Sequence, residues 1–368
     1  MGGVSMEFTT YTLGEVCSRL SSGKSIKAAE IFPAGKYPVY GGNGLRGYAD
    51  RSNFEGECAI IGRQGAYCGN VRYFKGEAYM TEHAVVCQAN EKADTYYLSA
   101  LLSTLHLERL SGQSAQPGLA VGTLSVQEIN LPSLETQRSI ASILSSLDRK
   151  IELNNKINAD LEEMAQAIFK NWFVDFEPFK DGKFVDSELG MIPEGWKVGR
   201  LGELCNFKRG KNLLTKNAID EGVPVVAGGL EPSCYHNVAN TGAPVITVSG
   251  SGANAGFTRM YHVPVWASDC SFIDISCENF YFVYCFLKVN SKLLKHAQTG
   301  AVQPHVKPSD IHDFELVIPD KESIYEFQDK VKSFFDKIAA IQKENSRLSL
   351  LRDTLLPRLM SGELEVPE

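Results

Sequence analysis

The sequence predicts an α+β fold built from two similar domains, each followed by a long α-helix. Three observations lead to this prediction. One pattern of residues occurs twice along the chain, short β-rich runs alternate with glycine-rich turns in both copies, and a heptad pattern follows each copy. A chain of 368 residues is also long enough to form two domains of ordinary size.

The repeat is clearest where the segment GAYCGNVRYF (65–74) aligns with GANAGFTRMY (252–261), an offset of 187 positions. The offset becomes 188 near the start, where Leu13-Gly14-Glu15 aligns with Leu201-Gly202-Glu203, so a small insertion or deletion intervenes. A register held over this length indicates an internal duplication. At 187 the alignment continues with Thr81-Glu82 on Ser268-Asp269, Tyr97 on Tyr284, Gln116-Pro117 on Gln303-Pro304, and Pro132 on Pro319.

Each copy predicts a mixed domain. β-rich runs occur at 58–61, 70–74 and 83–87 in the first copy and at 244–248 and 271–275 in the second, all bounded by turn residues. A helix is expected around 94–110 and around 279–297. The chain therefore divides into a first domain (1–131), a central spacer helix (132–178), a linker (179–194), a second domain (195–318) and a C-terminal spacer helix (319–364).

After Pro132 and Pro319 the apolar residues follow alternating steps of four and three, which is the heptad pattern of a helix that pairs with another helix. The repeat offset maps one pattern onto the other, and Arg352 interrupts the second. The residues expected to pair the helices are Leu144, Leu147, Ile151, Asn154, Leu161 and Ile168 in the first helix and Val331, Phe334, Ile338, Asn345, Leu348 and Leu355 in the second.

Each helix has to bury its apolar face, and the other helix is its simplest partner. Because a whole domain separates the two in the chain, an antiparallel coiled coil is expected. Pairing Ile140 with Leu359 places Asn154 level with Asn345. We expect these two amides to hydrogen-bond and fix the register, because a buried amide without a partner costs about 1–3 kcal/mol. The alternative is that both asparagines face solvent.

An antiparallel helix pair with a domain at each end would be a dumbbell with two separated, similar binding surfaces. About 33 seam residues at about 1.5 Å each give a length near 50 Å. In that length duplex DNA, at about 3.4 Å per base pair, presents roughly 14 base pairs. Double-stranded DNA is therefore the expected ligand, and a coiled-coil scaffold whose end domains bind other proteins is the alternative.

The net charge of −7 would argue against nucleic acid only if it were evenly spread. The acidic residues are concentrated in the helical segments: residues 131–194 contain 12 acidic and 7 basic groups. The two domains are close to neutral, so each can carry a locally basic face.

Nine cysteines without a C-x-x-C pair predict neither a disulfide framework nor a usual zinc site. The start MGGVSMEFTT lacks the basic and apolar regions of a signal peptide, and no apolar run approaches the roughly 20 residues that span a bilayer. We therefore expect a soluble, cytoplasmic protein with free thiols and no membrane partner.

No motif in the sequence predicts catalysis. An adenine methyltransferase needs a tetrapeptide of the N-P-P-F or D-P-P-Y kind, which the chain lacks, so a self-contained methyltransferase is disfavoured. The segment SGKSI (22–26) resembles a phosphate loop, but Ser18 replaces the required earlier glycine. The glycine-rich YGGNGLRG (40–47) is interpreted as turn chemistry. No metal or cofactor site is expected.

Base edges are read by Arg, Lys, Asn and Gln, and phosphates are held by Lys, Arg and hydroxyl groups. The DNA-contact candidates in or beside glycine-rich loops are Lys24, Arg46, Arg63, Gln64, Tyr67 and Arg72 in the first domain and Lys208, Arg209, Lys211, Asn254, Arg259 and His305 in the second. The counterparts of Arg63 and Gln64 are Gly250 and Ser251, as expected if the domains recognise different bases. Arg72 and Arg259 are shared, which suits a phosphate contact or an ion pair.

Three stretches closely resemble the DNA specificity subunits of type I restriction-modification systems. They are LPSLETQRSIASILSSLDRKIELNNKINADLEEMAQAIFKNWFVDFEPF (131–179), GMIPEGWKVGRLGEL (190–204) and LLRDTLLPRLMSGEL (350–364). The resemblance covers the whole chain in order, as target recognition domain, helical spacer, second recognition domain and second spacer.

The resemblance implies a bipartite, asymmetric DNA target, with one half-site for each recognition domain. It also implies that the helical spacers recruit two methyltransferase subunits and that restriction subunits join the complex. The chain itself would carry no catalysis and no cofactor, since S-adenosylmethionine would bind to the methyltransferase.

Overall fold

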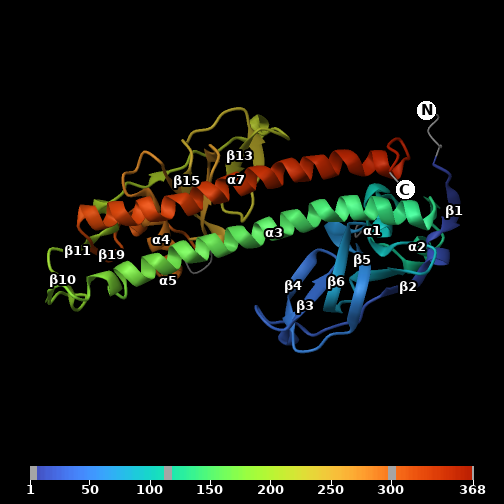
Figure 1. Cartoon of the computed structure of the whole chain (residues 1–368), viewed down its shortest axis with the longest axis horizontal. Helices are drawn as coiled ribbons and strands as arrows, with labels where there is room; N and C mark the ends of the chain where they lie inside the picture. The colour runs from blue at the N-terminus through green and yellow to red at the C-terminus, as the bar shows by residue number, and fades with distance from the viewer. Residues whose placement is uncertain (1–5, 112–117, 297–303, 367–368) are drawn as a thin grey trace. The chain divides into compact units, whose positions relative to one another are not determined.

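The structure is a computed structural model that describes residues 6–111, 118–296 and 304–366. The chain forms two compact units, residues 1–153 with 345–368, and residues 154–344. Each unit contains one copy of the repeat and one half of each long helix, α3 (Leu134–Phe173) and α7 (Lys321–Met360), coloured green and red in Figure 1. Both units combine helices with sheets, which confirms the predicted α+β class.

The first unit is built on a six-stranded sheet with the order β2-β7-β5-β6-β3-β4. β5 is antiparallel to both β6 and β7, and β3 is parallel to β6. The β-rich runs expected in the first copy fall on β5, β6 and β7, which confirms these strands. The six strands are β2 (Cys17–Ser22), β3 (Tyr37–Gly41), β4 (Gly44–Ala49), β5 (Phe54–Gly62), β6 (Val71–Met80) and β7 (Ala84–Ala89).

A β-bulge in β2 explains why the repeat offset changes near the start of the chain. Cys17 pairs with Ala89 of β7 and Arg19 pairs with Gln88, so Ser18 is an extra residue on its strand. The Ser18 hydroxyl donates to the carbonyl oxygens of Ala89 at 2.9 Å and of Gln88 at 3.3 Å. The bulge accommodates the extra residue that shifts the offset from 188 to 187.

The helix expected around 94–110 is shorter in the structure. α1 (Thr95–Thr104) begins after Asp94, whose carboxylate accepts a hydrogen bond from the backbone N–H of Tyr97 at 2.9 Å. Beyond it, His106 adopts a left-handed conformation with φ of 49°, and the 3₁₀ turn η4 (Leu107–Leu110) follows. The expectation of one continuous helix is therefore wrong, because a left-handed residue cannot continue an α-helix.

One apolar core joins the sheet of the first unit to its helices. Tyr97 and Leu98 of α1 are fully buried in it. Ile140 and Leu144, from the first half of α3, and Leu359, from the last half of α7, belong to the same core. The start of α3 thus packs with the end of α7 in this unit, as an antiparallel pair requires.

The second unit repeats the sheet with one interruption. Its strands form two sheets, in the orders β12-β18-β15-β16 and β14-β13-β17. The long strand β6 of the first unit corresponds to two short strands here, β16 and β17. Pro264 lies between them and has no N–H to donate to the hydrogen-bond ladder of the sheet. The runs expected at 244–248 and 271–275 fall on β15 and β18, which confirms these strands. The seven strands are β12 (Lys208–Arg209), β13 (Val223–Val226), β14 (Cys234–His236), β15 (Val245–Ser249), β16 (Thr258–Tyr261), β17 (Trp266–Ala267) and β18 (Cys270–Asp274).

The helix expected around 279–297 is also divided. α4 (Phe280–Val289) ends at Asn290, and α5 (Ser291–His296) follows directly. The side chain and the backbone N–H of Asn290 both donate to the carbonyl oxygen of Phe286, at 3.0 Å and 2.9 Å, where the helix ends. The expectation of a single helix is wrong here too.

A two-stranded ladder closes each copy. β1 (Thr9–Thr12) pairs with β8 (Glu128–Leu131) in the first unit, and β11 (Lys197–Arg200) pairs with β19 (Glu315–Ile318) in the second, both antiparallel. The short helices α2 (Val121–Ser125) and α6 (Pro308–His312) precede β8 and β19. A hairpin of β9 (Phe184–Val185) and β10 (Ile192–Pro193) lies between the copies in sequence. Each ladder brings the first strand of a copy beside the strand that leads into the next long helix.

Aromatic rings form much of the core of the second unit. The Phe169 ring of α3 lies 5.2 Å from the Phe282 ring of α4 and 5.7 Å from the Phe327 ring of α7, between centroids. Phe173, one helical turn later, is 5.0 Å from Phe282 and 5.2 Å from Phe327. The end of α3 therefore packs against the start of α7 and against the domain at once.

The heptad pattern missed this second direction of packing. It predicts Ile168 and Phe334 as pairing residues, and both are only partly buried against the core. Their neighbours Phe169 and Phe335 are 2% exposed each. A helix that contacts both a helix and a domain buries more than one stripe, so Phe169 and Phe335 are buried beside the heptad positions, and the pairing role of Ile168 and Phe334 stays a prediction.

The other residues expected to pair the helices lie on buried or half-buried faces. Those that are buried are Leu144, Asn154, Val331 and Ile338, and those that are half-buried are Leu147, Ile151, Leu161, Asn345, Leu348 and Leu355. Leu161 packs against the core of the second unit and Leu355 against the core of the first.

Arg352 interrupts the heptad pattern where α7 makes a polar contact in the first unit. Its guanidinium donates to the carboxylate of Asp148 in α3 at 2.8 Å. The Tyr96 hydroxyl of α1 donates to the other oxygen of Asp148 at 2.5 Å. Asp148 thus joins α3 to both α7 and α1. Since the Arg352 and Asp148 side chains are 34% and 40% exposed, the ion pair itself contributes no more than about 1 kcal/mol.

Asn154 is 1% exposed, which excludes the alternative that it faces solvent. Its amide donates to the carboxylate of Glu344 in α7 at 2.8 Å, within the second unit. A charged acceptor makes a hydrogen bond about twice as strong as a neutral one. The expected bond between Asn154 and Asn345 stays a prediction.

Asp320 precedes the first turn of α7. Its carboxylate accepts hydrogen bonds from the backbone N–H of Ser323 at 2.8 Å, from the Ser323 hydroxyl at 2.9 Å and from the indole N–H of Trp196 at 2.8 Å. Burial raises the pKa of Asp320, but these hydrogen bonds together outweigh burial and hold the pKa below its ordinary value.

Asp320→Ala is expected to lower the free energy of unfolding by about 0.5–2 kcal/mol at neutral pH, because α7 loses its cap. A depressed pKa stabilises the fold only while the carboxylate is ionised, so the difference from wild type should shrink as the pH falls through that pKa. Urea unfolding at a series of pH values down to pH 3 measures this. A pH-independent difference would contradict the assignment, and Asp186→Ala, in the exposed linker, is the control.

Parts of the two Gln-Pro turns, Gln116, Pro117 and Gln303, lie outside the described residues. Within the described ranges, no helix has the length and apolar character needed to cross a bilayer. In the same ranges, no group of three or more His, Cys, Asp or Glu side chains could hold a metal ion. All nine cysteines are free thiols.

Candidate nucleic-acid interface

The two copies share one loop frame around the predicted reading residues. The frame follows β5 through η3 (Gly65–Tyr67) in the first unit and β15 through η8 (Gly252–Asn254) in the second. The duplication thus extends to single hydrogen bonds. The bond from Gly69 N–H to the Gly62 oxygen (2.8 Å) in the first copy matches that from Gly256 N–H to the Ser249 oxygen (2.9 Å) in the second. The bond from Leu119 N–H to the Arg63 oxygen (2.8 Å) likewise matches that from Val306 N–H to the Gly250 oxygen (3.1 Å).

Lys24 and Lys211 occupy equivalent exposed positions beside this frame. The backbone N–H of Lys24 donates to the Met80 carbonyl at 2.9 Å, and Lys211 makes the equivalent bond at 2.9 Å. A Cβ on the preceding Gly23 would lie 2.1 Å from the Met80 oxygen, and Gly210 is equally confined. The glycines hold both lysines in place, which suits contact with the phosphates of a ligand.

Two predicted residues, Arg46 and Gln64, line one cleft in the first unit. Its volume is about 550 Å³, and Asn43 and His83 add two more polar side chains. Arg46 comes from β4, Asn43 from the β3–β4 turn, Gln64 from the residue before η3, and His83 from the loop before β7. We call this site the glycine cleft, because its remaining lining residues are Gly41, Gly42, Gly65 and Gly118.

Asn43 and His83 were missed by reasoning from the sequence. Asn43 lies in the run YGGNGLRG, and the structure confirms the turn there, because Gly41 and Gly44 pair across the β3–β4 hairpin. The turn also brings an amide to the cleft. His83 belongs to no local motif, and its signal is its place directly after the repeated Thr81-Glu82 pair.

The other candidates of the first unit lie near the cleft without lining it. Arg63 is half-buried, and its backbone N–H donates to the His83 carbonyl at 3.0 Å. Tyr67 in η3 is 48% exposed. Arg72 on β6 is exposed, and a Cβ built on Gly44 would lie 3.1 Å from its guanidinium carbon. A role for these three residues in DNA contact stays a prediction.

In the second unit three of the predicted polar residues, Arg209, Asn254 and Arg259, are engaged by the protein. Arg209 of β12 forms an ion pair with Asp269 at 2.5 Å, and the Ser251 hydroxyl donates to the same carboxylate. The Asn254 amide donates to the Gly228 carbonyl at 3.3 Å. Because one guanidinium nitrogen of Arg209 and the amide nitrogen of Asn254 already have protein partners, both residues contribute to the loop structure, and their contact with DNA stays a prediction.

Arg259 also has protein partners. Its guanidinium donates to the Leu230 carbonyl at 2.8 Å and lies 3.2 Å from the Glu231 carboxylate. Of the two alternatives for this shared arginine, the ion pair is therefore favoured at Arg259. His305 is half-buried and forms a backbone bridge with Ser251.

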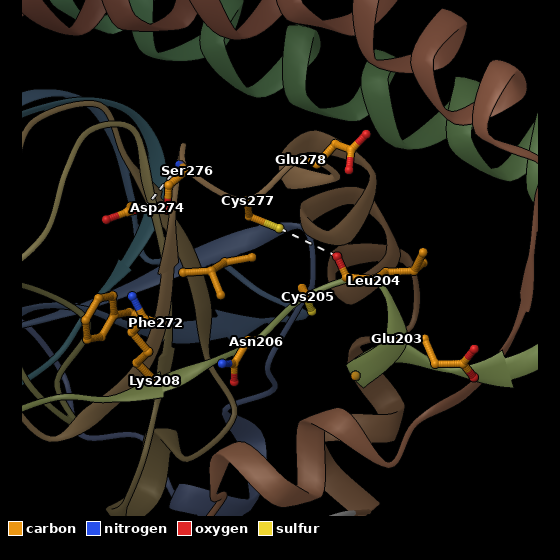
Figure 2. Close-up of a pocket in the computed structure, with 12 residues that line it drawn as sticks. Glu203, Leu204, Cys205, Asn206, Lys208, Phe272, Asp274, Ser276, Cys277 and Glu278 are labelled. Carbon is orange, nitrogen blue, oxygen red and sulfur yellow. Dashed lines mark hydrogen bonds between the residues drawn. The ribbon is translucent and has the colours of Figure 1, made fainter.

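A second cavity, of about 470 Å³, lies beside Lys208 in the second unit (Figure 2). Its lining runs from the end of η6 (Leu201–Glu203) to Lys208 and from the end of β18 to the turn before α4. Figure 2 shows that Glu203, Asp274 and Glu278 are among the lining residues, and that the Cys277 thiol points to the Leu204 carbonyl, at 3.8 Å.

Asp274 is ionised at neutral pH in this cavity. The Ser276 hydroxyl donates to it at 2.5 Å and is the main cause of a pKa below the ordinary value. Burial opposes this effect, while backbone N–H groups and nearby Lys208 add to it. Three carboxylates around one cavity repel phosphate, so we do not assign this cavity to DNA.

The buried thiols are not activated nucleophiles. Burial raises the pKa of Cys58 and of Cys270 to about 12, and it also raises the pKa of Cys205 and Cys285. A thiol with a raised pKa stays protonated at neutral pH and reacts slowly.

The sequence matches the family described as Type I restriction modification DNA specificity domain. The match covers residues 6–163 and again residues 193–349, so one match falls on each copy of the repeat.

Two relatives illustrate the similarity. The Type I restriction enzyme MjaIX specificity subunit of Methanocaldococcus jannaschii is 34% identical over 292 residues, which cover 72% of this chain and 66% of that protein. The Type I restriction enzyme EcoprrI specificity subunit of Escherichia coli is 42% identical over 141 residues, which cover 37% of this chain and 35% of that protein. The chain thus spans slightly less than two thirds of the first relative and about a third of the second.

The fold is also similar to a solved structure. The S subunit of the type-I restriction-modification system from M. genitalium superposes with a TM-score of 0.60 at 21% sequence identity. The alignment covers 100% of this chain and 98% of that chain, so the similarity of fold extends over both copies and both long helices.

Proposed function

Because the chain belongs to the type I restriction-modification DNA specificity family, we propose that it is the sequence-specific DNA-binding subunit of a type I restriction-modification complex. Each domain, 1–131 and 195–318, binds one half of a bipartite, asymmetric target in double-stranded DNA. The subunit is not itself catalytic.

The observation that carries this proposal is the loop frame that both copies keep with different side chains. Gln64 and Gly118 form a backbone bridge in the first copy, and Ser251 and His305 form the equivalent bridge in the second. Specificity for a base comes from the side chain, while the backbone sets its position. Two copies of one frame with different side chains are what recognition of two unlike half-sites requires.

We assign partner recruitment to the helical spacers, 132–178 and 319–364. Apolar side chains are exposed on both helices, with Leu153 at 54%, Tyr325 at 71% and Leu350 at 70%. Exposed apolar groups on helices of this kind support contacts with other proteins. Two methyltransferase subunits, which bind S-adenosylmethionine, dock on the spacers, and restriction subunits join that complex.

The methylated adenines of cells that carry the chain with its methyltransferase test this function. We expect a split motif, of which one half changes when residues 1–131 are exchanged for those of another specificity protein, while the other half stays. A methylome without such a motif would contradict the proposal.

A salt titration with duplex DNA separates this function from that of a protein-binding scaffold. Phosphate contacts predict that the logarithm of the binding constant falls by about 0.9 per contact for each tenfold increase in salt. A scaffold whose end domains bind proteins predicts little affinity for DNA at any salt concentration.

A further inference from the structure

The glycine cleft of the first unit is open because the residues around it lack side chains. Gly65 has a φ of 74°, and a Cβ on Gly65 or on Gly118 would meet no atom within 4 Å. A Cβ on Gly41 would lie 2.8 Å from Cδ of Arg46, so a larger residue there would displace the arginine. The glycines keep space free beside the polar side chains of the cleft.

Three of those polar side chains are not used by the protein. Asn43, Arg46 and Gln64 are exposed, and within the described part of the chain their side chains make no hydrogen bond or ion pair. The fourth, His83, lies 3.4 Å from the Glu82 carboxylate. One guanidinium and two amides therefore present all their donors and acceptors to a ligand.

The duplication provides an internal comparison for these groups. The second copy forms the same loop frame without a guanidinium or an amide at the equivalent positions, so the frame does not need them in order to fold. The counterparts of Arg46 and Gln64 are Ser233 and Ser251. Asn43 corresponds to Gly229 when the copies are aligned on β3 and β13, since Thr81 N–H bonds to the Tyr40 oxygen and Ser268 N–H to the Val226 oxygen.

We propose that Arg46 and Gln64 read two neighbouring purines of the first half-site from the major groove, Arg46 a guanine and Gln64 an adenine. A guanidinium donates two parallel hydrogen bonds to O6 and N7 of guanine, and a carboxamide accepts from N6 and donates to N7 of adenine. The inference rests on the proposed function, and it assigns a chemical class of target to one site of the first domain.

The composition of the glycine cleft favours base edges over phosphates. Phosphate sites use cations and hydroxyl groups, whereas two of the four polar side chains here are uncharged amides. Among the described residues that line the cleft, none carries a carboxylate, in contrast to the cavity around Asp274. The nearby Glu82 carboxylate is in contact with His83, so a DNA strand meets less repulsion here than at the cavity around Asp274.

Methylated adenines sequenced in cells that carry the full chain with its methyltransferase test the assignment. Arg46→Lys keeps the charge but loses the two parallel donors, so the preference for one guanine in the first half-site should fall by about 5- to 150-fold. Gln64→Ala should relax the preference for an adjacent adenine by a similar factor. The second half-site should be unchanged in both variants.

Arg51→Lys is the matched control. Arg51 is an exposed arginine of the same unit that pairs with Glu30 at 2.8 Å and does not line the cleft. This substitution should leave the motif unaltered.

Three outcomes would overturn the assignment of the glycine cleft while leaving the proposed function in place. A loss of methylation that is uniform over all sequences would assign Arg46 to a phosphate, and an unaltered split motif in both variants would exclude both side chains from base reading. A lower unfolding temperature of either variant would also count against the proposal, because it would show that the side chain supports the fold. A wild-type methylome without a split motif would instead remove the proposed function.

Discussion

Phe169→Ala is expected to lower the free energy of unfolding of the second unit by about 3–5 kcal/mol. Phe169 is 2% exposed, and its ring lies within 6.5 Å of the rings of Phe173, Phe282, Phe286 and Phe327, between centroids. These rings come from α3, α4 and α7, so the substitution removes apolar burial and leaves a cavity where three helices meet. Rigid elements on all sides limit how far such a cavity can collapse.

Urea unfolding of the full chain, followed by circular dichroism, measures this loss. Met164→Ala is the matched control, because Met164 lies on the same helix and is 50% exposed. We expect that control to change the free energy of unfolding by no more than about 0.5 kcal/mol. A Phe169→Ala variant as stable as the control would show that α3 does not anchor this domain.

The fold class follows from the sequence because duplication preserves spacing. An offset of 187 places equivalent residues at equivalent hydrogen bonds, and the structure shows this at Leu119 and Val306, whose N–H groups bond equivalent carbonyls. Even the change of offset has a structural cause, the bulge at Ser18. Patterns that extend over a hundred residues are little affected by local exceptions.

Local exceptions account for what the sequence did not predict in the fold. His106 follows the end of α1 in a left-handed conformation, which the types of the neighbouring residues do not predict. Pro264 divides a strand that is continuous in the first copy, where residue 77 is a glutamate. Phe169 is buried beside the half-buried Ile168 because a domain contacts the helix from a second side, and the periodicity of one helix does not predict that contact.

The candidate site was predictable in its residue types and not in their partners. Sequence reasoning selected Arg46 and Gln64 as DNA-contact candidates because polar side chains beside glycine turns are accessible, and the structure places both in the lining of one cleft. It selected Arg209 by the same criterion, although Asp269, 60 positions away, neutralises this arginine. Whether a side chain is available to a ligand depends on contacts between distant parts of the chain.

Asn154→Asp is expected to destabilise the second unit by about 3 kcal/mol at pH 7, in the range for an uncompensated buried charge. The wild-type amide is 1% exposed and donates to the Glu344 carboxylate at 2.8 Å. The variant has nearly the same size, but an ionised carboxylate only accepts hydrogen bonds. Two carboxylates at this distance in a buried site cannot both be ionised without a large cost.

This loss should shrink as the pH falls, as that of Asp320→Ala does, but in a window above the unfolded carboxylate pKa and not below it. In the folded variant, the like charge raises the pKa of the pair formed by the introduced carboxylate and Glu344 above the unfolded value of about 4. The penalty is therefore complete above the raised pKa and shrinks as the pH falls toward the unfolded value, because the pair then takes up a proton and can form a hydrogen bond again.

Urea unfolding of the wild type and the variant between pH 8 and pH 5 tests the sign of this dependence. Asn155→Asp is the control, since Asn155 is exposed on the same turn of α3 and a carboxylate there stays solvated. A penalty of the same size at every pH would mean that Asn154 supports the helix pair through its shape. A penalty that falls with pH identifies its N–H donor as the group that matches α3 to the carboxylate of α7, and so as the contact that resists a shift of register between the two helices.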